Sequence, residues 1–170
     1  KLSEAAVMLA AGVKSILLTS PLATVQKAQG LNALLQQHPD HKLHLVVDSK
    51  EGMEVLRQSI DADQQLGLLV DIDLSMGRTG TRDVETMLWL IDAMGRDQRF
   101  NFAGIQHYAG HLMHIPDYAK RKDKSLASWS RLDDFFSALE GRGIHCDIVT
   151  GGGTGTYDVD VAVDRITDLQ

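Results

Sequence analysis

The sequence has little cysteine and no long apolar run. Cys146 is the only cysteine among 170 residues, which excludes an internal disulfide and a cluster of thiolate metal ligands. No apolar stretch approaches the roughly 20 residues of a membrane span, and the opening KLSEAAVMLAAG lacks the basic and apolar segments of a secretory signal. We therefore expect a cytoplasmic protein with no membrane partner.

Positive charge is also scarce. The chain has 17 basic and 23 acidic residues and a net charge of -6. Because these charges are scattered, the sequence predicts no cationic face for nucleic acid or anionic lipid. No Gly/Ser/Pro linker divides the chain, and 44% hydrophobic residues suffice for a buried core. We expect one domain over residues 1–170.

Short runs rich in leucine and β-branched residues alternate with stretches of helical periodicity, which predicts βα units and a mostly parallel sheet. The five expected strands are Ser15–Ser20, Leu43–Asp48, Leu66–Asp73, Phe102–Tyr108 and Cys146–Thr150. The expected helices are Leu2–Ala11, apolar stripes at 25–35, 53–60 and 84–94, and one longer helix carrying Leu126 to Leu139. Such units could form an open doubly wound sheet or most of an eight-stranded barrel, and the strand pattern does not choose between them.

In either architecture a ligand lies at the C-terminal ends of the strands. At the first of these ends, Ser20 and Pro21 are best interpreted as the N-cap and first residue of a helix. The other ends carry most of the unusual chemistry of the chain.

The segment Thr150–Tyr157, TGGGTGTY, follows an apolar strand. Glycines allow successive backbone N–H groups to point at one spot, and threonine hydroxyls add donors, so the segment is suited to hold a phosphate. A flexible turn is the alternative. We favour the phosphate because an ordinary turn seldom needs this composition directly after a buried strand.

The segment after the third strand contains Asp71, Asp73 and Arg78. The two aspartates are two residues apart on a strand and so share a face. They could form a metal or acid/base site, but we favour a charge network with Arg78 that fixes the loop. Arg78 is the better functional candidate, because its guanidinium can bind a ligand carboxylate or phenolate oxygen.

Three histidines follow the fourth strand: His107, His111 and His114. Their spacing would allow two metal ligands, but no glutamate lies between them and Gly110 interrupts a helix. We favour Tyr108 and His111 as pocket donors or proton carriers, with structural hydrogen bonding as the alternative, and predict no metal site.

Four segments resemble, in order and spacing, the D-threonine aldolase and D-serine dehydratase family: EAAVMLAAGVKSILLTSP, VDIDLSMGRTG, FAGIQHYAGHLMH and IVTGGGTGTY. The resemblance covers essentially the whole chain, and the glycine-threonine segment is its most specific part. It implies the α/β fold of the alanine racemase N-terminal domain, a parallel (β/α)8 TIM-type barrel that is incomplete here, with about five βα units. It also implies pyridoxal 5'-phosphate as the cofactor.

The resemblance further implies roles for individual residues. The loop that holds the cofactor phosphate matches Gly152, Gly153, Thr154, Gly155 and Thr156. Arg78 matches an arginine near the phenolic oxygen of the cofactor. Tyr108 matches a tyrosine near the pyridine nitrogen, with His111 close by in the pocket.

Two features of the family have no counterpart in the chain. Members carry the lysine that binds the cofactor in a segment resembling His-x-Lys-Thr-His-Lys, and Lys1 does not match it. Members also have a β-rich C-terminal domain whose histidine and acidic residue bind a divalent metal. We therefore expect a fragment of a larger enzyme, which would be poorly stable and inactive alone, with the metal ligands outside residues 1–170.

The favoured function of the intact protein is retro-aldol cleavage of D-threonine to glycine and acetaldehyde. Dehydration of D-serine to pyruvate and ammonia is the closest alternative. A non-catalytic pyridoxal-phosphate homeostasis module and a sugar-phosphate enzyme are more distant ones; the latter would not account for the MGRTG and QHYAGH segments. We expect a small D-amino acid as the substrate and a homodimer as the intact assembly.

Overall fold

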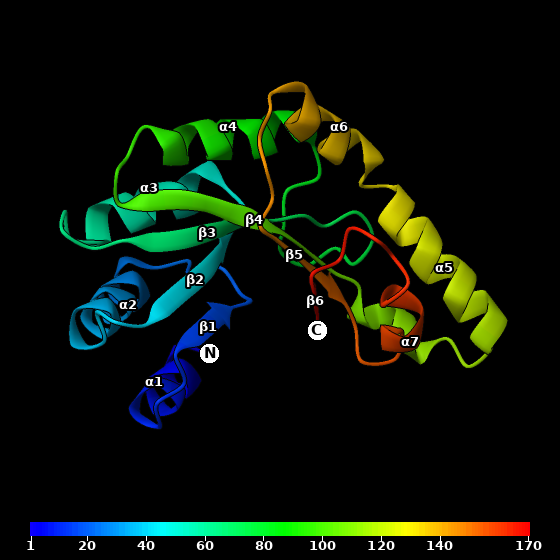
Figure 1. Cartoon of the computed structure of the whole chain (residues 1–170), viewed down its shortest axis with the longest axis horizontal. Coiled ribbons are helices and arrows are strands. Elements are labelled where there is room, and N and C mark those ends of the chain that lie inside the picture. The colour runs from blue at the N-terminus through cyan, green and yellow to red at the C-terminus, as the bar shows by residue number, and fades with distance from the viewer.

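A computed structural model describes all 170 residues as a single curled sheet with helices along its outer side (Figure 1). Every strand runs parallel to its neighbours and pairs with the next one along the chain. The strands are β1 (Ser15–Leu18), β2 (Lys42–Val47), β3 (Leu66–Asp71), β4 (Phe100–Tyr108), β5 (Ile148–Gly152) and β6 (Asp168–Leu169).

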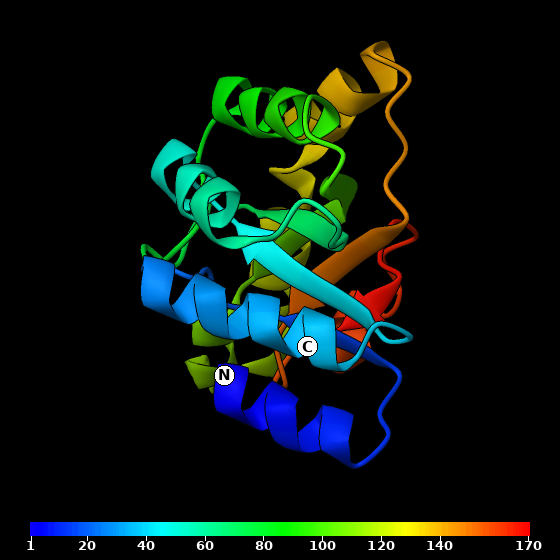
Figure 2. The same cartoon turned by 90° about the vertical axis from the view of Figure 1, so that its left-hand side faces the viewer.

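One helix precedes the first strand, and the others connect successive strands. The helices are α1 (Leu2–Ala10), α2 (Val25–Gln37), α3 (Lys50–Ser59), α4 (Val84–Gly95), α5 (Tyr118–Ser130), α6 (Asp133–Gly141) and α7 (Tyr157–Asp160), with a 3-10 turn, η1, at Gly110–His114. Figure 2 shows α1 and α2 side by side at the N-terminal edge. No helix has the length and apolar character that a membrane crossing requires.

The central strands of the sheet pack on both faces, and β3 is buried along its whole length. On the outer face, a core cluster of 31 residues joins the sheet to its helices and includes Leu68, Val70 and Ile105. On the inner face, Val46, Leu69 and Ala103 form a separate small cluster. Sequential strand order, outer helices and an apolar interior together identify an incomplete barrel rather than an open doubly wound sheet.

The prediction of one long helix from Leu126 to Leu139 is wrong, because the chain turns at Arg131 and Leu132 to give α5 and α6. The apolar stripe continues through the turn, so periodicity could not reveal the break. The two helices have different neighbours: α5 lies against η1 and α7, whereas α6 lies against α4. The turn thus lets the chain follow the curved sheet.

Other boundaries also differ from prediction. Ser20 is not a helix N-cap: α2 begins at Val25, and the Thr24 hydroxyl accepts a hydrogen bond from the N–H of Lys27 at 3.3 Å. The fifth strand extends to Gly152 rather than ending at Thr150. The sixth strand was not expected, because its two residues are exposed and carry no apolar pattern.

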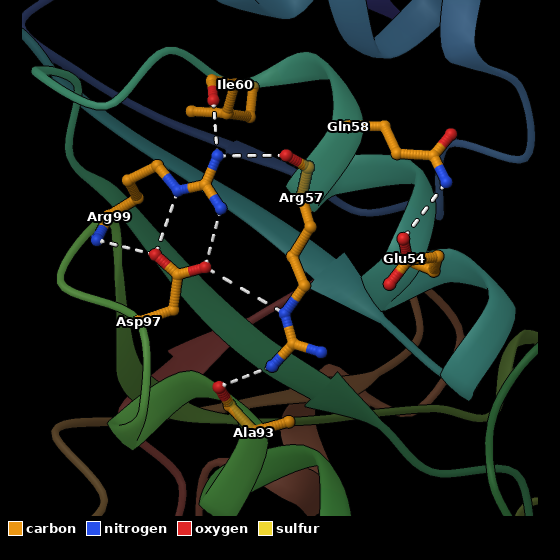
Figure 3. A network of polar contacts seen from close by, with 7 residues as sticks. All are labelled: Glu54, Arg57, Gln58, Ile60, Ala93, Asp97 and Arg99. Carbon is orange, nitrogen blue, oxygen red and sulfur yellow. Dashed lines mark hydrogen bonds and ion pairs between the residues drawn. The ribbon is translucent and has the colours of Figure 1, made fainter.

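A polar network ties α3 and α4 to the start of β4 (Figure 3). The Asp97 carboxylate accepts hydrogen bonds from Nε and Nη2 of Arg99 at 2.8 and 2.7 Å. Arg57 lies 3.8 Å from the same carboxylate and donates to the carbonyl of Ala93, while Arg99 donates to the carbonyl of Ile60. The hydrogen bonds from Arg99 hold the pKa of Asp97 below its usual value.

We predict that Asp97→Asn lowers the free energy of unfolding by about 2 kcal/mol at neutral pH, because it leaves guanidinium donors of a largely buried network unpaired. The wild-type contribution is complete above about pH 4, the unfolded pKa, and disappears as the pH falls through the lower folded pKa. Urea unfolding between pH 3 and 7 measures both effects.

The exposed pair of Asp92 and Arg142, 3.1 Å apart, provides the control. Asp92→Asn removes the same charge but should change the free energy of unfolding by less than about 0.5 kcal/mol. Equal losses in the two variants would contradict a special role for the network.

Candidate active site

The loop after β3 is shaped by one carboxylate. Asp73 is buried, and its oxygens accept hydrogen bonds from the backbone N–H groups of Ser75, Met76 and Arg78 at 3.0, 2.7 and 2.7 Å. Burial acts to raise the pKa of Asp73, but these amides outweigh it and hold the pKa below its usual value. Asp73 thus fixes the loop through backbone N–H groups, and the predicted charge network with the Arg78 guanidinium is wrong, because Arg78 forms no ion pair with either aspartate.

This loop places Arg78 against Tyr108, at the end of the neighbouring strand. The guanidinium carbon lies 5.2 Å from the centre of the Tyr108 ring, within range of a cation–π interaction. Arg78 is exposed and forms no ion pair with a carboxylate of the chain. The Tyr108 hydroxyl lies over Gly110, where any side chain would collide with it.

A buried polar layer lies at the ends of β3 and β4, and its centre is Gln106, whose contacts the sequence pattern does not predict. The Gln106 amide donates to Asp71 at 2.8 Å and to the carbonyl of Thr19 at 3.2 Å, and its oxygen accepts from Gln170 at 2.9 Å. The Thr79 hydroxyl donates to the other Asp71 oxygen. Burial raises the pKa of Asp71 to about 6, against the hydrogen bonds from Gln106 and Thr79.

This raised pKa gives a prediction with a definite sign. Between about pH 4 and 6 the unfolded Asp71 has lost its proton while the folded one retains it, so stability falls as the pH rises through this window. Asp71→Asn should remove that fall and raise the free energy of unfolding at pH 7 by about 1–3 kcal/mol. Urea unfolding at pH 4 and 7 is the measurement, and an unchanged difference between the two pH values would contradict it.

The three histidines after β4 occupy different surroundings. His107 is buried, with Nδ1 3.0 Å from the carbonyl of Ile72 and Nε2 2.8 Å from the Ser128 hydroxyl, and burial lowers its pKa. His111 lines a cavity of about 270 Å³ together with α5, and its buried Nδ1 has no hydrogen-bond partner. His114 is exposed. No three His, Cys, Asp or Glu side chains are arranged to hold a metal ion.

The glycine-threonine loop presents unpaired backbone donors. The N–H groups of Gly153, Thr154 and Gly155 make no hydrogen bond within the chain. The loop lies against η1: a Cβ on Gly155 would be 2.5 Å from the Cβ of Met113, and one on Gly153 would be 3.1 Å from the Cα of Gly110. Close packing therefore favours glycine at Gly153 and Gly155, two of the three residues with free N–H groups.

Thr156 ends this loop with its hydroxyl turned inward. The residue is buried, and its Oγ donates to Asp160 at 2.6 Å. Asp160 is not predicted from the sequence, because its spacing of four from Thr156 is common along helical turns and does not by itself indicate a function.

The structure therefore brings together most of the predicted site residues. Arg78 and Tyr108 touch each other, and the Ala109 N–H donates to the carbonyl of Gly152 at 2.8 Å, which joins β4 to the glycine-threonine loop. His111 lies on η1 and lines a cavity that it shares with α5 and with Ser75 of the loop after β3. The ends of β3, β4 and β5 thus offer a guanidinium, a phenol and a set of free N–H groups.

Comparisons with known proteins agree with the fold. The family model for the alanine racemase N-terminal domain matches residues 1–161. D-threonine aldolase from Arthrobacter sp is 30% identical over 171 residues, covering 100% of this chain and 44% of that protein. A 3-hydroxy-D-aspartate aldolase from Paracoccus denitrificans (strain Pd 1222) is 29% identical, covering 92% of this chain and 40% of that protein.

Among solved structures, D-threonine aldolase from Filomicrobium marinum superimposes with a TM-score of 0.92 at 26% identity, covering 100% of this chain and 45% of that one. D-threo-3-hydroxyaspartate dehydratase from Delftia sp. HT23 shares the fold, with a TM-score of 0.78 at 21% identity. The match covers 99% of this chain and 44% of that one. The chain spans less than half the length of these relatives.

Proposed function

Because the chain belongs to the alanine racemase N-terminal domain family, we propose that it forms the cofactor-binding part of a pyridoxal-phosphate-dependent lyase. The observation that carries the proposal is that the free N–H groups at Gly153–Gly155 follow the strand end that pairs with Tyr108, at the same edge of the sheet as the Arg78–Tyr108 pair. The names of the relatives support D-3-hydroxy amino acids as the proposed substrate class. We favour D-threonine, cleaved to glycine and acetaldehyde.

The residues present fit this cofactor. Three unpaired N–H groups in a close-packed glycine loop suit a phosphate dianion, which backbone donors bind well. Arg78 has a free guanidinium for the phenolic oxygen, and the Tyr108 hydroxyl is a neutral partner for the pyridine nitrogen.

Pyridoxal phosphate supplies, when bound, a conjugated ring that accepts the electron pair of a bond broken at the amino acid α-carbon. The protein residues have simpler tasks in this proposal. The loop anchors the phosphate, and Arg78 stabilises negative charge on the phenolic oxygen. His111, with an unpartnered ring nitrogen, remains our candidate for moving a proton, and we place the ligands of a divalent metal outside residues 1–170.

The test uses the protein with the flanking sequence of its gene. Added pyridoxal phosphate should give a visible absorption band that borohydride abolishes, and D-threonine should yield acetaldehyde and glycine. 3-Hydroxy-D-aspartate and D-serine, assayed in parallel, define the substrate. Pyruvate from D-serine without any aldehyde product would replace the aldolase with a dehydratase, and no cofactor band in a folded protein would overturn the proposal.

A further inference from the structure

Asp160 is a fully buried carboxylate that only neutral groups surround. Its relative exposure is 0%. Its donors are the Ser125 hydroxyl, the indole N–H of Trp129 at 3.1 Å and the Thr156 hydroxyl at 2.6 Å, and no cationic side chain lies within ion-pair distance. Because burying a carboxylate without a counter-ion is costly, its retention here depends on these hydrogen bonds.

The two oxygens of Asp160 serve two different segments. Oδ1 accepts from Ser125 and Trp129, both on α5. Oδ2 accepts from Thr156, at the end of the glycine-threonine loop. The carboxylate is therefore the link between α5 and this loop.

Asp160 contacts the loop at both of its ends. Besides binding the Thr156 hydroxyl, its carboxylate lies against Gly152, where an added Cβ would collide with Oδ2. Gly152 has φ of +74°, so a side chain there would be strained as well. The free N–H groups of residues 153–155 lie between these two contacts.

The attachment of α5 depends on the same contacts. Its buried residues are Ser125, Ser128 and Trp129, and two of the three donate to Asp160. Ser128 binds His107. Trp129 also packs in the apolar core cluster, so the hydrogen bonds to Asp160 add to this packing in holding the inner face of α5 to the barrel.

We propose that Asp160 is a positioning residue for phosphate recognition: it holds the loop in the conformation in which the N–H groups of Gly153, Thr154 and Gly155 face one anion. This inference rests on the proposed function. Asp160 acts through Gly152 and Thr156 and does not touch the cofactor. An asparagine has one acceptor oxygen and no charge, so the Thr156 or Ser125 hydroxyl would have to turn and accept from its amide N–H, which weakens the hold on the loop or on α5.

The experiment compares two ligands that differ only in the phosphate. Dissociation constants of pyridoxal phosphate and pyridoxal are measured by spectral titration of the protein with its natural flanking sequence. Asp160→Asn should raise the dissociation constant of pyridoxal phosphate about tenfold or more. It should raise that of pyridoxal less than about twofold, because the ring contacts are unchanged. Asp158→Asn is the matched control, since Asp158 is exposed and binds only Tyr118.

A second pair of variants covers the case in which Asp160→Asn does not fold. Thr156→Val removes the hydroxyl that binds Asp160, and Thr156→Ser keeps it. Thr156→Val should weaken the binding of pyridoxal phosphate much more than that of pyridoxal. Thr156→Ser should keep most of the affinity for pyridoxal phosphate.

The outcomes separate this inference from the function it rests on. Equal loss of both ligands, or unchanged affinity for pyridoxal phosphate, would show that Asp160 has only a structural role. If the wild-type protein binds pyridoxal as tightly as pyridoxal phosphate, the assignment of the glycine-threonine loop as the phosphate site is wrong.

Discussion

Replacing Gly155 with alanine should weaken the binding of pyridoxal phosphate about 100-fold, a loss of roughly 3 kcal/mol that corresponds to two charge-assisted N–H contacts. The new Cβ would lie 2.5 Å from the Cβ and 2.8 Å from the Cα of Met113. The backbone of η1 cannot move aside cheaply, so the loop must shift and its N–H groups separate. Spectral titration with pyridoxal phosphate and pyridoxal measures the loss.

Gly141→Ala is the matched control, because an added Cβ there meets nothing within 4 Å. It should leave both dissociation constants unchanged. A Gly155→Ala protein that binds pyridoxal phosphate normally would show that the phosphate lies elsewhere.

Replacing Gly104 with alanine should lower the free energy of unfolding by about 3–5 kcal/mol. Gly104 has φ of +153°, and an added Cβ would collide with the carbonyl of Ile148 on the paired strand. Relief would require β4 and β5 to separate where they support Tyr108 and Gly152. Urea unfolding measures the change.

Gly95→Ala is the corresponding control for stability. Gly95 is the last residue of α4, and a Cβ there meets nothing within 4 Å, so the substitution should be neutral or stabilise by up to about 1 kcal/mol. A loss of less than about 1 kcal/mol in Gly104→Ala would contradict the predicted collision.

The reach of sequence reasoning is clear from particular elements. Apolar runs predict β2 and β3 almost to their ends, because strands buried on both faces have a continuous pattern. The break between α5 and α6 is missed, because the apolar stripe passes through it. Thr24 is missed as a cap for a related reason: Ser20 before Pro21 carries the stronger local signal, although the helix begins later.

Some residues of the candidate site are likewise predictable from the sequence, and others are not. Arg78 and the glycine-threonine loop have local signatures, since each follows a strand and contains the residue types that an anion needs. Asp160 has none, because its role depends on Ser125 and Trp129, which are 35 and 31 residues away. His111 has a suggestive neighbourhood in the sequence, but the fold places it against α5.

The sequence alone thus determined the parallel βα order, the strand ends that carry polar chemistry and the family resemblance, because these depend on periodicity and composition within short windows. The tertiary structure decided which side chains meet. In the folded chain the sheet is curled, Arg78 lies against the Tyr108 ring, and Asp160 is buried between α5 and the glycine-threonine loop. Such contacts join residues far apart in the chain, and their free energy depends on burial and geometry that no local pattern encodes.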